Sequence, residues 1–203
     1  MSIVNTPAFI IGNGPSRRGV DLASLEGTTY GCNALYRDFA PDFLVAVDKK
    51  MQEEIIASGY HENHICYFRD PQRSPKILQH PNIITWKHHR GAVNNSGIAA
   101  VYHAMKHGHR TIVLLGMDLK TERHDANIYA DTPNYLNQNN KPPKVRRNIF
   151  DTLSDWFIRN HKIIKFVRVI DDKCWNPAVD NQYKVEGFSE PYLTHMTYKE
   201  YFK

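Results

Sequence analysis

A continuous apolar run that ends in glycine, Thr111–Gly116 (TIVLLG), constrains the fold more than any other segment of this chain. Runs of this kind fill the buried centre of a parallel sheet, because such strands are covered on both faces. Ala8–Gly12 (AFIIG) has the same form. Further strand candidates are Thr28–Cys32, Phe43–Val47, Ile65–Phe68, Ile83–Trp86 and Ile163–Ile170. Together these segments predict a mainly parallel sheet.

Apolar residues recur with helical spacing in segments between several of these runs. Ser96–His107 carries apolar side chains at positions i, i+3, i+4 and i+7, beginning at Ile98, and Gly108 follows as a stop signal. Two more helices are predicted by Lys49–Ser58 with Gly59 after it, and by the apolar stripe Val145, Ile149, Leu153, Trp156 and Phe157. Strands that alternate with helices predict an α/β fold, with one Rossmann-like domain over residues 1–203 and helices flanking the sheet.

Charge and composition restrict the partners. The 203 residues carry a net charge of +5 and the isoelectric point is near 9.0, so phosphates, nucleotides and acidic glycans are suitable ligands. The strongest basic cluster, Lys144, Arg146 and Arg147, is short, which disfavours nucleic acid as the main partner. No apolar run approaches the roughly 20 residues of a transmembrane helix, and the N-terminal residues lack the features of a signal peptide, so we expect a cytoplasmic protein. Composition leaves a homo-oligomer open.

The residues that follow the strands matter most, because ligands of open parallel sheets bind beyond the carboxyl ends of the strands. Gly12, Asn13, Gly14 and Ser16 come directly after the first strand candidate. Two glycines allow the backbone to approach a ligand closely, and free amide groups there can bind phosphate oxygens. The segment resembles the opening of the dinucleotide fingerprint GxGxxG, but its sixth position is Arg17. The alternative is a plain turn that ends the strand.

Other polar residues occupy equivalent positions. Asn33 follows the second strand candidate, where it can bind a base or a ribose hydroxyl, or simply form a turn. Asn95, Ser96 and Gly97 open the clearest helix, whose N-terminus favours an anion, although Asn and Ser are also common helix caps. Asp118 follows the TIVLLG run and is a further candidate for the nucleotide site.

Residues 120–143 are polar, rich in asparagine and long for a connection in a compact domain. We expect this segment to be a lid-like loop, the alternative being a solvated insertion. Its tyrosines, Tyr129 and Tyr135, are able to stack on a ligand or to hydrogen-bond to it. His124 with its neighbour Asp125 is a candidate general base at neutral pH, and the alternative is an ordinary loop histidine.

No metal site is predicted. His103 and His107 are four residues apart, a spacing that permits a metal ligand pair, but no glutamate accompanies them as in HExxH, and a solvated polar helix face is favoured. The cysteines Cys32, Cys66 and Cys174 lie far apart and form no zinc ligand set.

The order of the motifs resembles a known family. The segments FIIGNGPS, GCN and NSGIAAVYHAMKHGHRTIVLLGMDL follow one another as in the core of the bacterial sialyltransferases that share a single Rossmann-like domain with a lid. They are also similar to the related superfamily that includes archaeal-type 6-hydroxymethyl-dihydropterin pyrophosphokinases. The resemblance covers about the first 120 residues.

This resemblance implies a nucleotide site. It implies that the cytidine nucleotide is held by Asn13, Gly14, Ser16, Asn33, Ser96 and Gly97, and that Tyr129 and Tyr135 contact the leaving phosphate. The family places its general-base histidine after the lid, where this chain reads KPPKVRRNIF and has no histidine. Either His124 or Asp125 then takes over the base role, or the substrate differs, or the activity is absent.

The leading functional prediction is a transferase with a nucleotide-activated donor, a nucleotide-sugar glycosyltransferase of sialyltransferase-like type that acts on a glycan or a small-molecule acceptor. No cofactor is required if the departing phosphate is neutralised by Tyr129, Tyr135, Lys144 and Arg146. One alternative is a pterin-type diphosphotransferase, which needs Mg²⁺ and would use Asp48 and Asp118. The other is a nucleotide-binding module without catalysis.

Overall fold

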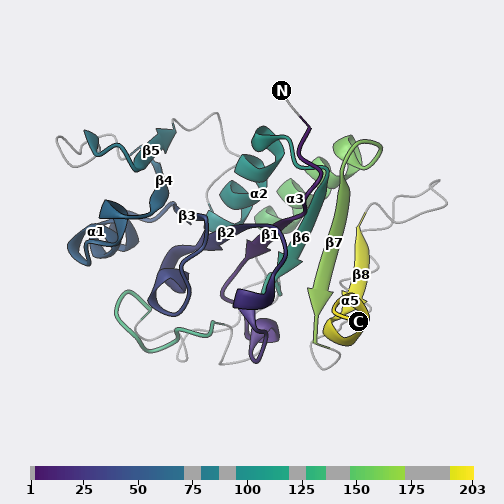
Figure 1. Cartoon of the computed structure of the whole chain (residues 1–203), viewed down its shortest axis with the longest axis horizontal. Coiled ribbons are helices and arrows are strands. Elements are labelled where there is room, and N and C mark those ends of the chain that lie inside the picture. The colour runs from purple at the N-terminus through teal and green to yellow at the C-terminus, as the bar shows by residue number, and fades with distance from the viewer. Residues whose placement is uncertain (1–2, 71–78, 87–94, 119–126, 136–146, 172–192) are drawn as a thin grey trace.

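One parallel sheet crosses the whole molecule (Figure 1). The computed structural model describes residues 3–70, 79–86, 95–118, 127–135, 147–171 and 193–203. Within these ranges the strands are β1 (Ala8–Ile11), β2 (Thr28–Cys32), β3 (Phe43–Ala46), β4 (Ile65–Arg69), β5 (Ile83–Trp86), β6 (Thr111–Leu115), β7 (Lys165–Ile170) and β8 (Thr194–Thr197). All neighbouring strands are parallel, and their order is β5-β4-β3-β2-β1-β6-β7-β8. The predicted α/β, Rossmann-like fold is confirmed.

Helices cover the sheet. They are α1 (Lys49–Ala57), α2 (Ser96–His107), α3 (Arg147–Asn160) and α5 (Tyr198–Tyr201), with short 3₁₀ turns η1 (Pro15–Arg17), η2 (Leu22–Ser24), η3 (Asn33–Arg37) and η4 (Tyr60–Glu62). The predicted bounds of α2 are confirmed, because Asn95 caps its start and Gly108 ends it at a φ of 93°. Among the helices of the described residues, none has the length and apolar character of a membrane span.

The strands send alternate side chains into cores on opposite faces. Ile10 and Leu114 pack in one core with residues of α2 and α3, such as Ala100 and Phe157. Their neighbours Ile11 and Leu115 pack on the other face, together with Leu22, Leu35 and the tyrosines of α5. The central strands are therefore covered on both sides, which is why they are continuous apolar runs in the sequence.

Successive strands are added first on one side of β1 and then on its other side. Strands β2 to β5 extend from one side of β1, and β6 to β8 extend from the other. Ile10 consequently pairs with Tyr30 on one neighbour and with Leu114 on the other. The carboxyl ends of β1 and β6 form the topological switch point, the usual position of a ligand in such sheets.

The short helix α5 was not predicted, and two strands differ from the predictions by more than one residue. β8 was not predicted, because its sequence, THMT, lacks an apolar run and all four residues are only half-buried at the edge of the sheet. β7 begins at Lys165, two residues later than predicted, because Ile163 belongs to the turn after α3 and is 59% exposed.

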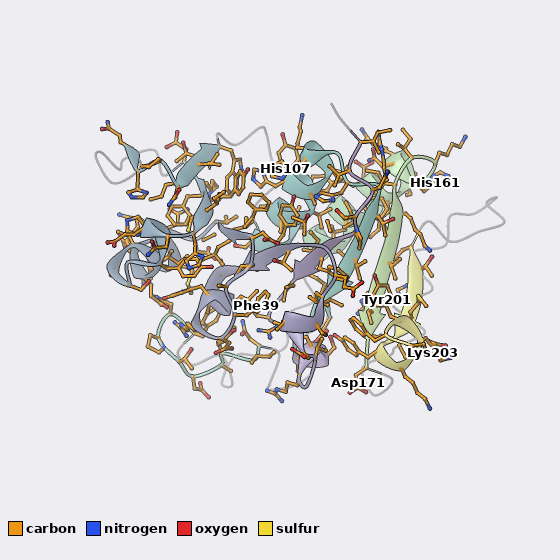
Figure 2. All side chains as sticks on the ribbon, in the orientation of Figure 1. Phe39, His107, His161, Asp171, Tyr201 and Lys203 are labelled. Carbon is orange, nitrogen blue, oxygen red and sulfur yellow. The ribbon has the colours of Figure 1, made fainter. Side chains whose placement is uncertain are left out.

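The predicted solvated face of α2 is wrong. His103 is 6% exposed and its ring lies 4.1 Å from that of Tyr67. Nδ1 and Nε2 of His107 share hydrogen bonds of 2.6 and 2.9 Å with the hydroxyls of Tyr30 and Tyr67. These histidines belong to a buried aromatic cluster, and Figure 2 shows His107 at the end of the sheet opposite to Asp171, which follows β7. They lie away from the carboxyl ends of the strands.

This burial makes stability sensitive to acid. Burial, with a smaller effect of His107, lowers the pKa of His103 to about 4, whereas the unfolded chain retains the ordinary value of 6.5. Between these values the unfolded chain binds a proton that the folded protein does not, so stability decreases as the pH falls from 6.5 towards 4. We expect His103 to lower the free energy of unfolding by about 2 kcal/mol at pH 5 relative to pH 8.

Urea unfolding at both pH values measures this loss. His103→Phe should reduce it, whereas His161→Phe, at the end of α3, should retain the behaviour of the unchanged protein. An equal acid sensitivity of both variants would contradict the assignment to His103.

Candidate functional site

The loops after β1 and β6 are in direct contact at the switch point. The amide of Gly12 donates to the carbonyl of Leu115 and the amide of Gly14 donates to that of Gly116, both at 2.8 Å. A Cβ atom on Gly12 would lie 2.5 Å from the Gly116 oxygen, and one on Gly14 would lie 2.6 Å from the same oxygen. Gly12 and Gly14 are therefore needed for the packing of one loop on the other.

Ser16 and Asp118 bind each other across this junction. The Ser16 amide donates to Asp118 Oδ2 at 3.0 Å, and the Ser16 hydroxyl donates to Asp118 Oδ1. Ser16 is 2% exposed. From β7, the buried Arg168 donates to the carbonyls of Met117 and Asp118, at 3.1 and 2.7 Å. The amides of Gly14 and Ser16, expected to bind phosphate, are thus already paired with protein acceptors.

We call residues 12–17, which follow β1, the glycine loop, and the side chain of its last residue, Arg17, packs against the loop that follows β6. Arg17 is 7% exposed, and its stem lies against Gly116, where a Cβ would be 3.0 Å from Arg17 Cδ. The Nε atom of Arg17 donates to the Gly12 carbonyl at 2.7 Å. The side chain in the sixth position of the fingerprint therefore occupies the crevice between β1 and β6.

A second polar group lies beyond the carboxyl ends of β1, β2 and β3, on the other side of β1. We call Asn13, Asn33, Ser96 and Tyr135 the asparagine cluster. The Ser96 hydroxyl donates to Asn33 Oδ1 at 2.7 Å and accepts from the Val47 amide at 3.1 Å. Asn13 Nδ2 donates to the Cys32 carbonyl at 3.1 Å. The structure thus brings three predicted motifs, GNG, CN and NSG, to one place.

Two features mark this cluster as more than a set of turns. Asn33 has a φ of 54°, in the left-handed region that residues other than Gly, Asn and Asp rarely adopt. Asn13 Oδ1 is buried and has no hydrogen-bond partner in the described part of the chain. An unpaired buried acceptor costs about 1–3 kcal/mol, which a ligand donor would offset.

Tyr135 completes the cluster from the predicted lid. Its pKa is raised by burial, although hydrogen bonding from the side chains of Asn13 and Asn33 opposes the shift. The negative charge of Asp48, which follows β3, raises it further. The Tyr135 hydroxyl therefore stays protonated at neutral pH and lies beside both asparagines.

The start of α2 is capped by the protein itself. Asn95 Oδ1 accepts from the amides of Gly97 and Ile98, at 2.8 and 3.3 Å. A Cβ on Gly97 would lie 2.7 Å from the side chain of Met117, so Gly97 lets α2 pack against the β6 loop. Asn95 and Gly97 consequently have structural roles, and Ser96 is the residue of this motif that belongs to the asparagine cluster.

Residues 127–135, the described part of the predicted lid, dock against the body of the protein. We call them the strap. Its first anchor is the Ile128 amide, which donates to the Asn13 carbonyl at 2.8 Å. Tyr129 is 5% exposed, and its hydroxyl donates to Asp38 at 2.6 Å and accepts from Arg17 at 3.0 Å. Tyr129, expected to contact a leaving phosphate, is held by these two residues.

The far end of the strap is clamped by charged residues of η3 and α1. Arg37 pairs with Glu54 and donates to the Thr132 hydroxyl at 2.7 Å and to the Pro133 carbonyl at 2.9 Å. Asn134 Nδ2 donates to Glu54 Oε2 at 2.5 Å. Sequence reasoning missed Arg17, Arg37, Asp38 and Glu54 as supports of the strap, because their partners in the strap are 80 to 112 residues away in the chain.

His124, Asp125, Lys144 and Arg146 lie outside the described residues. Among the residues that are described, no group of three or more His, Cys, Asp or Glu side chains is arranged to hold a metal ion.

Comparison with known proteins adds no identification. Neither a protein-family model, nor a curated protein, nor a solved structure matches this chain.

The left-handed conformation of Asn33 gives a prediction on stability. Asn33→Ala and Asn33→Gly both remove the hydrogen bond from Ser96, but only alanine adds the strain of a Cβ at positive φ. We expect Asn33→Ala to be less stable than Asn33→Gly by about 1 kcal/mol in chemical unfolding. Equal stabilities, or a more stable alanine variant, would contradict the role of the backbone conformation.

Proposed function

We propose that the protein is a transferase with a nucleotide-activated donor, a nucleotide-sugar glycosyltransferase of sialyltransferase-like type. The observation that carries the proposal is the meeting of Asn13, Asn33 and Ser96 beyond the carboxyl ends of β1 to β3, with a buried Asn13 oxygen left unpaired. The motif order that resembles the sialyltransferases supports it, because these same residues match the nucleotide-binding positions of that family.

In this proposal side chains, rather than backbone amides, bind the nucleotide. Asn13 Nδ2 binds the Cys32 carbonyl and Asn33 Oδ1 binds Ser96, so the unpaired Asn13 Oδ1 is an acceptor for a ligand. Asn33 Nδ2 has two N–H groups, and the one that does not bind Tyr135 is a donor for a ligand. Such a pair suits a ribose hydroxyl or an amide edge of a base. The positive end of α2, which begins at Ser96, favours the phosphate nearby.

The proposed reaction is a direct displacement at the anomeric carbon. The bond from that carbon to the phosphate oxygen breaks, a bond to the acceptor oxygen forms, and the acceptor hydroxyl loses its proton to a base. The neutral Tyr135 hydroxyl supplies a hydrogen bond to the departing phosphate, which gains negative charge in this step. His124 and Asp125 remain the proposed bases.

The geometry gives less support to the pterin-type alternative. Mg²⁺ needs carboxylate oxygens that are free to coordinate it. Of the two candidates, Asp118 already accepts hydrogen bonds from the amide and the hydroxyl of Ser16, whereas the Asp48 side chain caps no amide of α1. A transferase that needs no metal is therefore the better supported reading.

A thermal-shift screen with CMP, UDP, GDP, ADP and their sugars, with and without Mg²⁺, tests the binding step. We expect at least one nucleotide to raise the melting temperature without Mg²⁺, since a ligand at a hundredfold excess over its Kd stabilises a protein by about 2.7 kcal/mol. Binding that depends strictly on Mg²⁺ would favour the pterin-type chemistry, and no binding at all would contradict the proposal.

The nucleotide found in this way then tests the asparagine cluster. Asn33→Gly keeps the backbone conformation but removes the side chain, so it should weaken binding about tenfold or more, as expected for one lost hydrogen bond in a buried site. The matched control is Asn63→Gly on the exposed end of η4, which should bind as the unchanged protein does. Equal affinities of the two variants would place the nucleotide elsewhere.

Tyr135→Phe separates binding from catalysis. Loss of a hydrogen bond to the departing phosphate should lower kcat about 10²–10³-fold, with a smaller effect on nucleotide affinity. Because the Tyr135 pKa is raised, the loss should be the same at pH 6 and pH 9. Tyr102→Phe on α2 is the control, and a Tyr135→Phe enzyme with unchanged kcat would remove this residue from the reaction.

A further inference from the structure

We infer that Arg17 is a positioning residue that locks the strap to the glycine loop and so holds Tyr135 beside Asn13 and Asn33. This inference rests on the proposed function for the role of Tyr135, but the structural link itself stands on contacts of Arg17. A glycine or alanine in the sixth position of the dinucleotide fingerprint could make none of these contacts.

The contacts of Arg17 use both its geometry and its charge. Nε donates to the Gly12 carbonyl at 2.7 Å, while Nη2 donates to the Tyr129 hydroxyl at 3.0 Å. The planar guanidinium makes both bonds at once with two nitrogens, which the single ammonium group of lysine cannot reproduce. Because the side chain is 7% exposed, water offers little replacement for either bond.

The hydroxyl of Tyr129 binds a carboxylate as well as Arg17. Its hydroxyl donates to Asp38 Oδ2 at 2.6 Å while it accepts from Arg17, so a neutral tyrosine joins a buried cation to an anion. Burial and Asp38 raise the pKa of Tyr129 and Arg17 lowers it, with the net effect upward, so the hydroxyl keeps the proton that it donates. The Tyr129 ring also lies 5.8 and 5.7 Å from the guanidinium carbons of Arg17 and Arg37, within cation–π range.

A compact series of turns connects Tyr129 to Tyr135. The Thr132 amide donates to the Tyr129 carbonyl, the Tyr135 amide donates to the Thr132 carbonyl, and the Asp131 amide donates to the Tyr135 carbonyl. The two tyrosine rings are 6.3 Å apart. The position of Tyr129 therefore determines that of Tyr135, and Arg17 acts on the asparagine cluster through Tyr129.

Hydrogen exchange on the full-length protein without nucleotide tests the link. Arg17→Lys keeps the charge but loses the two guanidinium nitrogens that bind Gly12 and Tyr129 at once. Tyr129→Phe removes only the hydroxyl, and this milder variant serves if Arg17→Lys folds poorly. We expect either variant to raise the exchange rate of the strap amides at least tenfold, while the amides of β1 and β6 stay protected. Arg159→Lys, the same change at an exposed residue of α3 that pairs with Asp155, should leave the strap unchanged.

Two further measurements separate positioning from simple packing. The ring signal of Tyr135 in ¹³C-tyrosine NMR, assigned with Tyr135→Phe, should shift in Arg17→Lys and in Tyr129→Phe by similar amounts. The double variant should exchange no faster than the more affected single variant, because both changes break one chain of contacts. Unchanged strap exchange and an unmoved Tyr135 signal, or additive effects in the double variant, would overturn the inference.

A failure of the inference about Arg17 can be distinguished from a failure of the proposed function. If the unchanged protein binds no nucleotide, the proposed function fails, yet strap exchange and the Tyr135 signal still decide the role of Arg17. If nucleotide binds and strap exchange is unaffected by Arg17→Lys, the proposed function stands and the inference about Arg17 is wrong.

Discussion

The close contact between the carboxyl ends of β1 and β6 is the constraint on which the rest of the structure depends. Two backbone hydrogen bonds join these loops, and the absence of side chains at Gly12, Gly14 and Gly116 allows them to approach. The Ser16–Asp118 pair and the Arg17 side chain then fill the remaining space. Side chains and hydrogen bonds of the protein thus fill the junction between the ends of β1 and β6, and the glycines there allow the two loops to pack on each other.

The asparagine cluster lies on the other side of β1. There the polar residues after β1, β2 and β3 meet the start of α2, and the strap covers them with Tyr135. The strap is itself a supported element, since Arg17, Arg37 and Glu54 bind it from the body of the protein. One arginine in the glycine loop therefore connects the closed switch point with the geometry of the proposed site.

The sequence was informative where local rules decide the structure. Apolar runs predicted β1 and β6 because both faces of these strands are buried, and Asn95 and Gly108 bounded α2 because capping is local chemistry. It was uninformative where long-range contacts decide. His103 looked like a surface residue because no periodicity reveals that Tyr67 and Trp86 pack against it, and edge strand β8 has no apolar signal. The motifs placed Asn13, Asn33 and Ser96 at strand and helix ends, but not the pairing of Ser16 with Asp118 or of Arg17 with Tyr129.

The central claim is that nucleotide binds at Asn13 and Asn33, on the β1–β3 side of the closed switch point. The most direct test is a titration of ¹⁵N-labelled protein with the bound nucleotide, in which the side-chain amide signals of Asn13 and Asn33 are assigned by substitution to Asp. Both signals should shift and saturate with the same Kd, while the signal of Asn63, the residue after η4, stays in place. Saturable nucleotide binding that leaves the Asn13 and Asn33 signals unmoved would contradict it.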